Sequence, residues 1–181
     1  MRIITGTLKG RQIRIPKTLD VRPTTDRVKE GMFSVIDARK FLAGARVTDL
    51  FAGSGGLGFE ALSRGAEHVL FVEQDARNTS HIEELAEEFG VADRCRTAIT
   101  RVEDFLEGPT LPADFVLCDP PYEYPHMEEM VDRILEVGWL HPGGWLVLEH
   151  DSRHDFREHP RLLQQKEYGR TYVCFFEAAE A

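Results

Sequence analysis

The sequence has few cysteines and no long apolar run. Only three of its 181 residues are cysteine, and Cys95, Cys118 and Cys174 are far apart and lack metal-ligand spacing. No stretch approaches the roughly 18 apolar residues that a membrane-spanning helix needs, and the first residues show no signal-like run. We therefore expect buried reduced thiols, no metal site, no membrane segment and a cytoplasmic location.

Positive charge is scarce and concentrated near the amino terminus. The net charge is −9, yet residues 1–46 hold eleven Lys or Arg against four acids, and the remainder hold eleven against twenty-seven. A solvated charged face is one interpretation of this asymmetry. A basic arm that contacts nucleic-acid phosphates is the other, and its candidate residues are Arg11, Arg14, Arg22, Arg27 and Lys29.

The hydrophobic pattern predicts an α/β core with a small amino-terminal addition. Residues 1–16 alternate around Lys9-Gly10 as in a β-hairpin, and an amphipathic helix follows Thr25 or Asp26 as its cap. Strands are then expected at 46–51, 68–73, 94–99, 114–119 and 145–150, with helices between them and two further strands within 162–177. Such alternation predicts a mostly parallel sheet covered on both faces. We take residues 1–40 as the addition and 41–181 as the core.

A glycine loop follows the first predicted strand. Gly53, Gly55 and Gly58 have the G-x-G-x-x-G spacing between a strand and a helix, where glycine allows a tight turn and close backbone approach to a ligand. Glu73 ends the next strand, where a carboxylate can accept hydrogen bonds from both ribose hydroxyls. Nicotinamide enzymes and S-adenosylmethionine enzymes share these features.

Asp49 favours S-adenosylmethionine as the ligand. It lies in the first strand, four residues before Gly53, where a carboxylate attracts a cationic amino group but not a pyrophosphate. With Glu73 and Asp119 nearby, the acids suit a sulfonium-bearing zwitterion. The alternative is that Asp49 only satisfies loop amides.

The CDPPY segment at the end of the fourth strand predicts a site for an amine. An exocyclic or amide nitrogen is a poor nucleophile, and two acceptors placed against its N–H bonds would localise its lone pair. Asp119 offers a carboxylate, Pro120 a carbonyl and Tyr122 a ring for stacking a base, while adjacent prolines fix φ and remove competing N–H groups. A strand-ending turn without function is the alternative.

These segments resemble class I S-adenosylmethionine-dependent methyltransferases: DLFAGSGGLGFEALSRGA, VEQD, CDPPY and LEH. The segment RPTTDRVKEGMFS, preceded by RIITGTLKGRQIRIP, more narrowly resembles the bacterial enzymes that methylate the N2 amine of a guanine in 16S ribosomal RNA. The resemblance implies a Rossmann-like, seven-stranded, mostly parallel sheet with an antiparallel final hairpin.

The resemblance also implies roles for individual residues. Asp119 and the Pro120 carbonyl would receive the amine and Tyr122 would stack the guanine. The implied cofactor contacts are Asp49, Phe51, Gly53, Ser54, Gly55, Glu73 and Val102. Arg101 departs from the pattern, because it stands where many relatives carry a group that accepts a hydrogen bond from the cofactor's adenine amine, and a guanidinium cannot accept one. Val102 is expected to contact the adenine by its backbone, leaving the amine's partner open between Glu103 and Asp104.

The predicted reaction is direct transfer of a methyl group from S-adenosylmethionine to the N2 amine of an extruded guanine, with S-adenosylhomocysteine as product and no metal. The expected partner is 16S ribosomal RNA or a small-subunit assembly particle, and the expected state is a monomer. The alternatives are methylation of adenine N6 in DNA or RNA or of a protein glutamine, a nicotinamide oxidoreductase, and a non-catalytic RNA-binding module.

Overall fold

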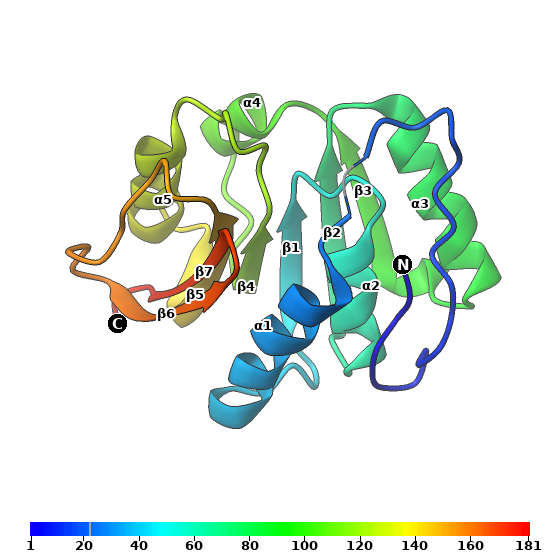
Figure 1. Ribbon diagram of the computed structural model, residues 1–181, viewed down its shortest axis with the longest axis horizontal. Coiled ribbons are helices and arrows are strands. Elements are labelled where there is room, and N and C mark those ends of the chain that lie inside the picture. The colour runs from blue at the N-terminus through cyan, green and yellow to red at the C-terminus, as the bar shows by residue number, and fades with distance from the viewer. Residues whose placement is uncertain (22) are drawn as a thin grey trace.

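The computed structural model describes residues 1–21 and 23–181 and contains a seven-stranded sheet (Figure 1). The strand order is β3-β2-β1-β4-β5-β7-β6, in which β7 runs antiparallel to both of its neighbours and the other pairings are parallel. This confirms the predicted fold and its antiparallel final hairpin. The strands are β1 (Arg46–Leu50), β2 (His68–Glu73), β3 (Cys95–Ile99), β4 (Ala113–Cys118), β5 (Leu140–His150), β6 (Leu162–Tyr168) and β7 (Thr171–Glu177).

Helices cover both faces of the sheet (Figure 1). Alternate strand residues enter different hydrophobic clusters: Phe115 packs with residues of α1, α2 and α3, whereas Val116 packs with residues of α4 and α5. Thr25 caps α1 and Asp75 caps α3, each accepting from a first-turn backbone N–H. The helices are α1 (Asp26–Arg39), α2 (Gly56–Ser63), α3 (Ala76–Glu88), α4 (Val102–Glu107) and α5 (Met127–Glu136), with a short 3₁₀ helix at Ala92–Arg94.

β5 begins at Leu140, five residues before the predicted start of that strand. Leu140 pairs with Ala113, and the register then shifts so that Trp145 pairs with Phe115. The segment HPGG, which precedes the predicted strand, is therefore incorporated into β5 at this irregularity.

The predicted amino-terminal β-hairpin is present but short. Residues 1–13 fold back on themselves, with Arg2 and Gln12 in an antiparallel bridge, and the N–H groups of Ile3 and Ile13 donate to the carbonyls of Arg11 and Met1 across the two arms. The backbone N–H groups of Ile4 and Thr5 donate to the Glu60 carboxylate of α2, at 2.9 and 3.1 Å. The two arms and the turn between them therefore form an amino-terminal loop that is docked on α2.

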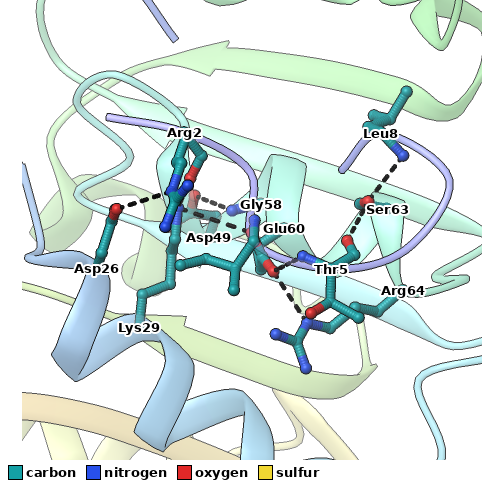
Figure 2. A network of polar contacts seen from close by, with 11 residues as sticks. Arg2, Thr5, Leu8, Asp26, Lys29, Asp49, Gly58, Glu60, Ser63 and Arg64 are labelled. Atoms are coloured by element: carbon teal, nitrogen blue, oxygen red, sulfur yellow. Dashed lines mark hydrogen bonds and ion pairs between the residues drawn. The ribbon is translucent and has the colours of Figure 1, made fainter. Parts of the chain in front are cut away.

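Lys29 lies on the buried face of α1, where it joins a network with this loop (Figure 2). Its ammonium donates to the Arg2 carbonyl at 2.5 Å and lies 3.6 Å from Glu60 Oε2, and both charged side chains are fully buried. Burial lowers the pKa of Lys29, although the nearby Glu60 carboxylate opposes that shift. The prediction that Lys29 contacts RNA is therefore wrong, because its charge faces the protein interior.

Arg64 completes the network around Glu60 (Figure 2). Its Nε donates to Glu60 Oε1 at 3.0 Å, and its terminal nitrogen lies 2.6 Å from Asp37 on α1. Ser63, beside it on α2, donates to the Thr5 carbonyl and accepts from the Leu8 N–H. Polar contacts from α2 thus hold both α1 and the amino-terminal loop.

The cysteines carry free thiols, with Cys118 and Cys174 buried and Cys95 half-buried. Burial raises the pKa of Cys95 and of Cys174 to about 12, which disfavours a reactive thiolate. Across residues 1–21 and 23–181, the helices are too short or too polar to cross a membrane.

Candidate active site

The candidate site lies at the carboxyl edge of the sheet, the upper ends of β1, β2 and β4 in Figure 1. Leu50 is in register with Cys118, and Cys118 is in register with Leu148. The residues that follow, Phe51, Asp119 and Glu149, therefore lie side by side at this edge, with Glu149 still paired to Val173 of β7. This edge is where open α/β sheets bind ligands.

The glycine loop needs its glycines for its own backbone and packing. Gly53 and Gly55 have φ values of 56° and 82°, in the left-handed region. A Cβ on Gly58 would lie 2.2 Å from the Phe71 ring, so this glycine lets α2 approach β2 closely. Ser54 is buried in the same loop.

Phe51 adopts φ 57°, an uncommon conformation for a residue with a side chain. Its ring packs edge-on against Tyr124, with centroids 5.2 Å apart. This contact joins the glycine loop to the loop that follows Asp119. Such outliers cluster at binding and catalytic sites.

Glu73 supports the loop from the end of β2. One carboxylate oxygen accepts from the Gly53 N–H at 2.8 Å, and the other accepts from the Asp75 N–H at 3.0 Å. A carboxylate oxygen can accept more than one hydrogen bond. The arrangement therefore fixes the carboxylate while leaving it able to bind ribose hydroxyls.

Asp49 is buried beneath the loop and is 1% exposed. Its Oδ2 accepts from the Gly58 N–H at 3.0 Å, which is an amide contact of the kind the alternative interpretation requires. Burial raises the pKa of Asp49 well above its usual range, and the Asp119 and Glu73 charges add to that shift. A cationic ligand group would reverse this effect by stabilising the carboxylate.

Asp119 and Pro120 leave β4 at the centre of this edge. Asp119 is half-buried, and its Oδ2 accepts from the Thr24 hydroxyl at 2.8 Å. Pro120 is buried. The hydroxyl oxygen of Tyr122 lies 3.1 Å from that of Thr171, within hydrogen-bonding distance. The Tyr122 side chain is therefore held against the start of β7.

Thr24 and Glu149 are site residues to which the sequence assigned no role. The Thr24 hydroxyl oxygen lies 3.2 Å from Glu149 Oε2 as well as 2.8 Å from Asp119, and both Thr24 and Glu149 are buried. A signal for Glu149 was present in the sequence, since an acid stands near the end of the next predicted strand after the one that delivers Asp119. Thr24 carried no such signal, because only the tertiary structure brings it to this edge.

Thr18 and Val21 lie at the carboxyl edge. Val21 lies over the glycine loop, because a Cβ added to Gly53 would stand 2.8 Å from Val21 Cγ1. The Thr18 carbonyl accepts from Arg77 at the start of α3, at 3.5 Å. A pocket of about 440 Å³ opens beside this contact, and its described lining is Pro16, Thr18, Leu19, Ala76, Arg77, Ser80, His81 and Glu84.

The start of α4 contains the residues predicted near the cofactor's adenine. Val102 is buried in the cluster beneath α4, and the exposed Arg101 lies 3.5 Å from Glu103 Oε2. Burial opposes ionisation of Glu103, but hydrogen bonds from its own backbone and from Tyr124, with the Arg101 charge, lower its pKa overall. Glu103 thus already has Tyr124 and Arg101 as partners. Whether Glu103 or Asp104 accepts from the cofactor's adenine amine stays a prediction.

The predicted basic arm is spread over the surface instead of gathered at the crevice. Arg11, Arg14 and Arg27 are exposed, whereas Arg22 lies outside the described residues. The Arg11 guanidinium lies 6.0 Å from the ring centre of Phe89, at the far end of α3. Since α3 has 13 residues, it separates Arg11 from the carboxyl edge by about 20 Å.

Within residues 1–21 and 23–181, His, Cys, Asp and Glu side chains form no group of three that could hold a metal ion. The chemistry available at this edge comes from carboxylates, backbone carbonyls and an aromatic ring. Such groups can orient an amine, and the acids suit a ligand that carries positive charge.

Comparison with known proteins matches residues 1–177 to the family described as Conserved hypothetical protein 95. YlbH of Bacillus subtilis (strain 168), named provisionally as an rRNA methyltransferase, is 35% identical over 190 residues, which cover 98% of each chain. The ribosomal RNA small subunit methyltransferase D of Escherichia coli (strain K12) is 36% identical over 141 residues, covering 77% of this chain and 69% of that protein.

Solved structures share the architecture. The Escherichia coli protein yhhF, described provisionally as a methyltransferase, matches with a TM-score of 0.86 at 28% identity, over 100% of this chain and 99% of that one. A Salinibacter ruber RNA methyltransferase in complex with S-adenosyl-L-homocysteine matches with a TM-score of 0.69 over 88% of this chain and 95% of that one. At 19% sequence identity, this match shows that the two proteins share a fold. The chain belongs to the Conserved hypothetical protein 95 family, a family of S-adenosylmethionine-dependent methyltransferases.

Proposed function

We propose that this protein transfers a methyl group from S-adenosylmethionine to the N2 amine of a guanine in 16S ribosomal RNA of the small subunit. The observation that carries the proposal is the placement of Asp119 and Pro120 at the carboxyl edge, next to the glycine loop with Asp49 and Glu73. The sequence similarity to a small-subunit ribosomal RNA methyltransferase supports the choice of substrate.

The residues at this edge fit the proposed cofactor. A cationic amino acid moiety suits Asp49, and ribose hydroxyls suit the Glu73 carboxylate. Gly53 and Gly55 present loop backbone without side chains. Phe51 and Ser54 lie on the same loop, and Val102 begins α4. When bound, S-adenosylmethionine would supply a methyl group that is electrophilic because it is attached to a sulfonium.

Asp119 and Pro120 then act on the acceptor nitrogen. The Asp119 carboxylate and the Pro120 carbonyl accept from its two N–H bonds, which turns its lone pair toward the methyl group. Tyr122 stacks on the extruded base, and Asp119 can take up the proton that the nitrogen loses as the new N–C bond forms.

Methyl transfer with nucleoside analysis tests the proposal. Purified protein is incubated with tritiated S-adenosylmethionine and with naked 16S RNA, free small subunits or assembled ribosomes, and the labelled nucleosides are separated. Label in N2-methylguanosine supports the proposal. Label only in N6-methyladenosine or in protein glutamine points to the rival amines, and binding of RNA without transfer points to a non-catalytic module.

The basic arm predicts a salt dependence of RNA affinity. Replacement of Arg11 and Arg14 by glutamine is expected to reduce the magnitude of the slope of log K against log salt by about 1.5, since each phosphate contact contributes about 0.7 to 0.9. Filter binding to 16S RNA between 50 and 300 mM salt, on the order of the range over which such contacts weaken, measures the slope. Arg46→Gln is the matched control, because Arg46 is also an exposed arginine, at the start of β1, and is not among the residues predicted to contact RNA. Equal slopes in all three proteins would contradict the contacts.

Asp49 predicts proton release when the cofactor binds. Burial raises the pKa of Asp49, so the free protein retains a proton there to higher pH than an ordinary aspartate would, and a cationic amino group lowers that pKa, so binding favours release of the proton. Affinity should therefore fall as pH drops through the raised pKa. Calorimetry at about pH 6, where an α-amino group is already charged, in buffers of different ionisation enthalpy measures the release. Asp49→Asn should abolish it, and unchanged release in that variant would assign the proton elsewhere.

A further inference from the structure

Two acidic side chains converge on one hydroxyl beside the proposed acceptor site. Asp119 and Glu149 each follow residues that pair in register on β4 and β5, so both point to the same face of the sheet. Asp119 Oδ2 and Glu149 Oε2 lie 2.8 and 3.2 Å from the Thr24 hydroxyl oxygen. The Thr24 hydroxyl therefore fixes the distance between the Asp119 and Glu149 carboxylates at the carboxyl edge.

Glu149 is not needed to hold an amine if Asp119 and Pro120 do so. Its side chain is only 5% exposed, and a buried carboxylate costs free energy unless it has partners. One of those partners is Thr24, and a carboxylate has about four acceptor positions in total. Because a carboxylate can accept from several donors at once, Glu149 can accept an N–H from a base bound against Asp119 in addition to its partners within the protein.

The chemistry of the bases decides which one fits such a pair of acceptors. The N2 amine of guanine lies next to the ring N1–H, so this edge presents a row of donors. The amines of adenine and cytosine each lie next to a ring nitrogen that is an acceptor, and a glutamine amide places its carbonyl oxygen beside the amine. Against Glu149 those neighbouring atoms would meet a carboxylate lone pair.

We infer that Glu149 selects guanine by accepting a hydrogen bond from its N1–H while Asp119 accepts from its N2 amine. The inference rests on the proposed function and adds to it a residue that determines specificity. Thr24 acts as a positioning residue, since its hydroxyl contacts both carboxylates. The same arrangement disfavours adenine, because a site built for an N–H leaves its acceptor unpaired when the donor is missing.

The test compares methylation of three different bases at one nucleotide position. Wild-type protein first locates the methylated guanosine, and 16S RNA is then assembled by ligation with guanosine or 2-aminopurine there. 2-Aminopurine keeps the N2 amine but has an acceptor at N1. The wild-type kcat/KM is expected to favour guanosine by about 100-fold or more. 6-Thioguanosine keeps N1–H while altering O6, and it should remain within about tenfold of guanosine if N1–H is the group that is read.

Glu149→Gln tests the residue itself. A glutamine amide can accept from guanine N1–H or donate to N1 of 2-aminopurine, so the preference should fall to about tenfold or less. Thr24→Val should lower kcat on guanosine with little change in KM, and Thr24→Ser should restore it.

The possible results separate the inference about Glu149 from the proposed function. Equal wild-type rates on guanosine and 2-aminopurine would overturn the inference without any variant, even if Glu149→Gln failed to fold. An unchanged preference in a folded Glu149→Gln would overturn it while leaving the proposed function standing. If the wild-type protein methylates no guanosine, both fall together.

Discussion

Asp119→Ala is expected to lower kcat for methyl transfer by about 100- to 1000-fold, the effect of removing one hydrogen-bonding group that acts in a transition state. Without the carboxylate, one N–H of the acceptor amine has no partner and the nitrogen lone pair stays delocalised. Asp119→Asn keeps one carbonyl acceptor, so its loss should be smaller than that of alanine. Single-turnover transfer of tritiated methyl to small-subunit RNA measures the rate.

The cofactor affinity of Asp119→Ala provides the control. Asp119 follows β4, whereas Asp49 lies near the end of β1 and Glu73 ends β2, so S-adenosylmethionine should bind within a few-fold of the wild-type affinity. A variant that binds cofactor and RNA normally and still transfers methyl at the wild-type rate would remove Asp119 from the mechanism. A variant that loses cofactor binding would assign Asp119 to the cofactor site instead.

Glu60→Ala is expected to lower the free energy of unfolding by about 3 to 5 kcal/mol, as the loss of one partner from a buried ion pair does. The change would leave the buried Lys29 ammonium with only the Arg2 carbonyl. It would also remove the acceptor for the Ile4 and Thr5 N–H groups. Urea denaturation followed by circular dichroism measures the difference.

Arg2→Gln is the matched control for that experiment. The Arg2 side chain pairs with Asp26 at 3.3 Å in an exposed position, and its carbonyl, which accepts from Lys29, remains after substitution. Exposed pairs contribute about 0 to 1 kcal/mol, so this variant should stay close to the wild type. If Glu60→Ala were no more destabilised than Arg2→Gln, the buried network would not hold the amino-terminal loop.

The local features of this fold could be predicted from the sequence. Apolar runs that alternate with periodic helical segments identified the sheet, because burial of one face of each element depends on spacing within that element. Thr25 and Asp75 cap their helices through contacts only a few residues long. The positions of the glycine loop and of Asp119 at strand ends followed from the same local pattern.

Long-range contacts decided the features that the sequence interpretation missed. Lys29 was predicted to belong to the basic arm, but Glu60 from α2 pairs with its ammonium in the interior. The same carboxylate binds the Ile4 and Thr5 amides, and this contact docks the short hairpin on α2. Hydrophobic periodicity carries no information about such pairs, because the free energy of a buried charge depends on its partner.

The sequence by itself determined the fold class, the glycine loop and the aspartate at the end of β4. Only the tertiary structure placed Thr24 between Asp119 and Glu149. These residues come from a loop and two strands that are distant in sequence, and they meet because β4 and β5 pair in parallel with Cys118 opposite Leu148. Strand order and register arise from packing of the whole chain, and no single segment encodes them.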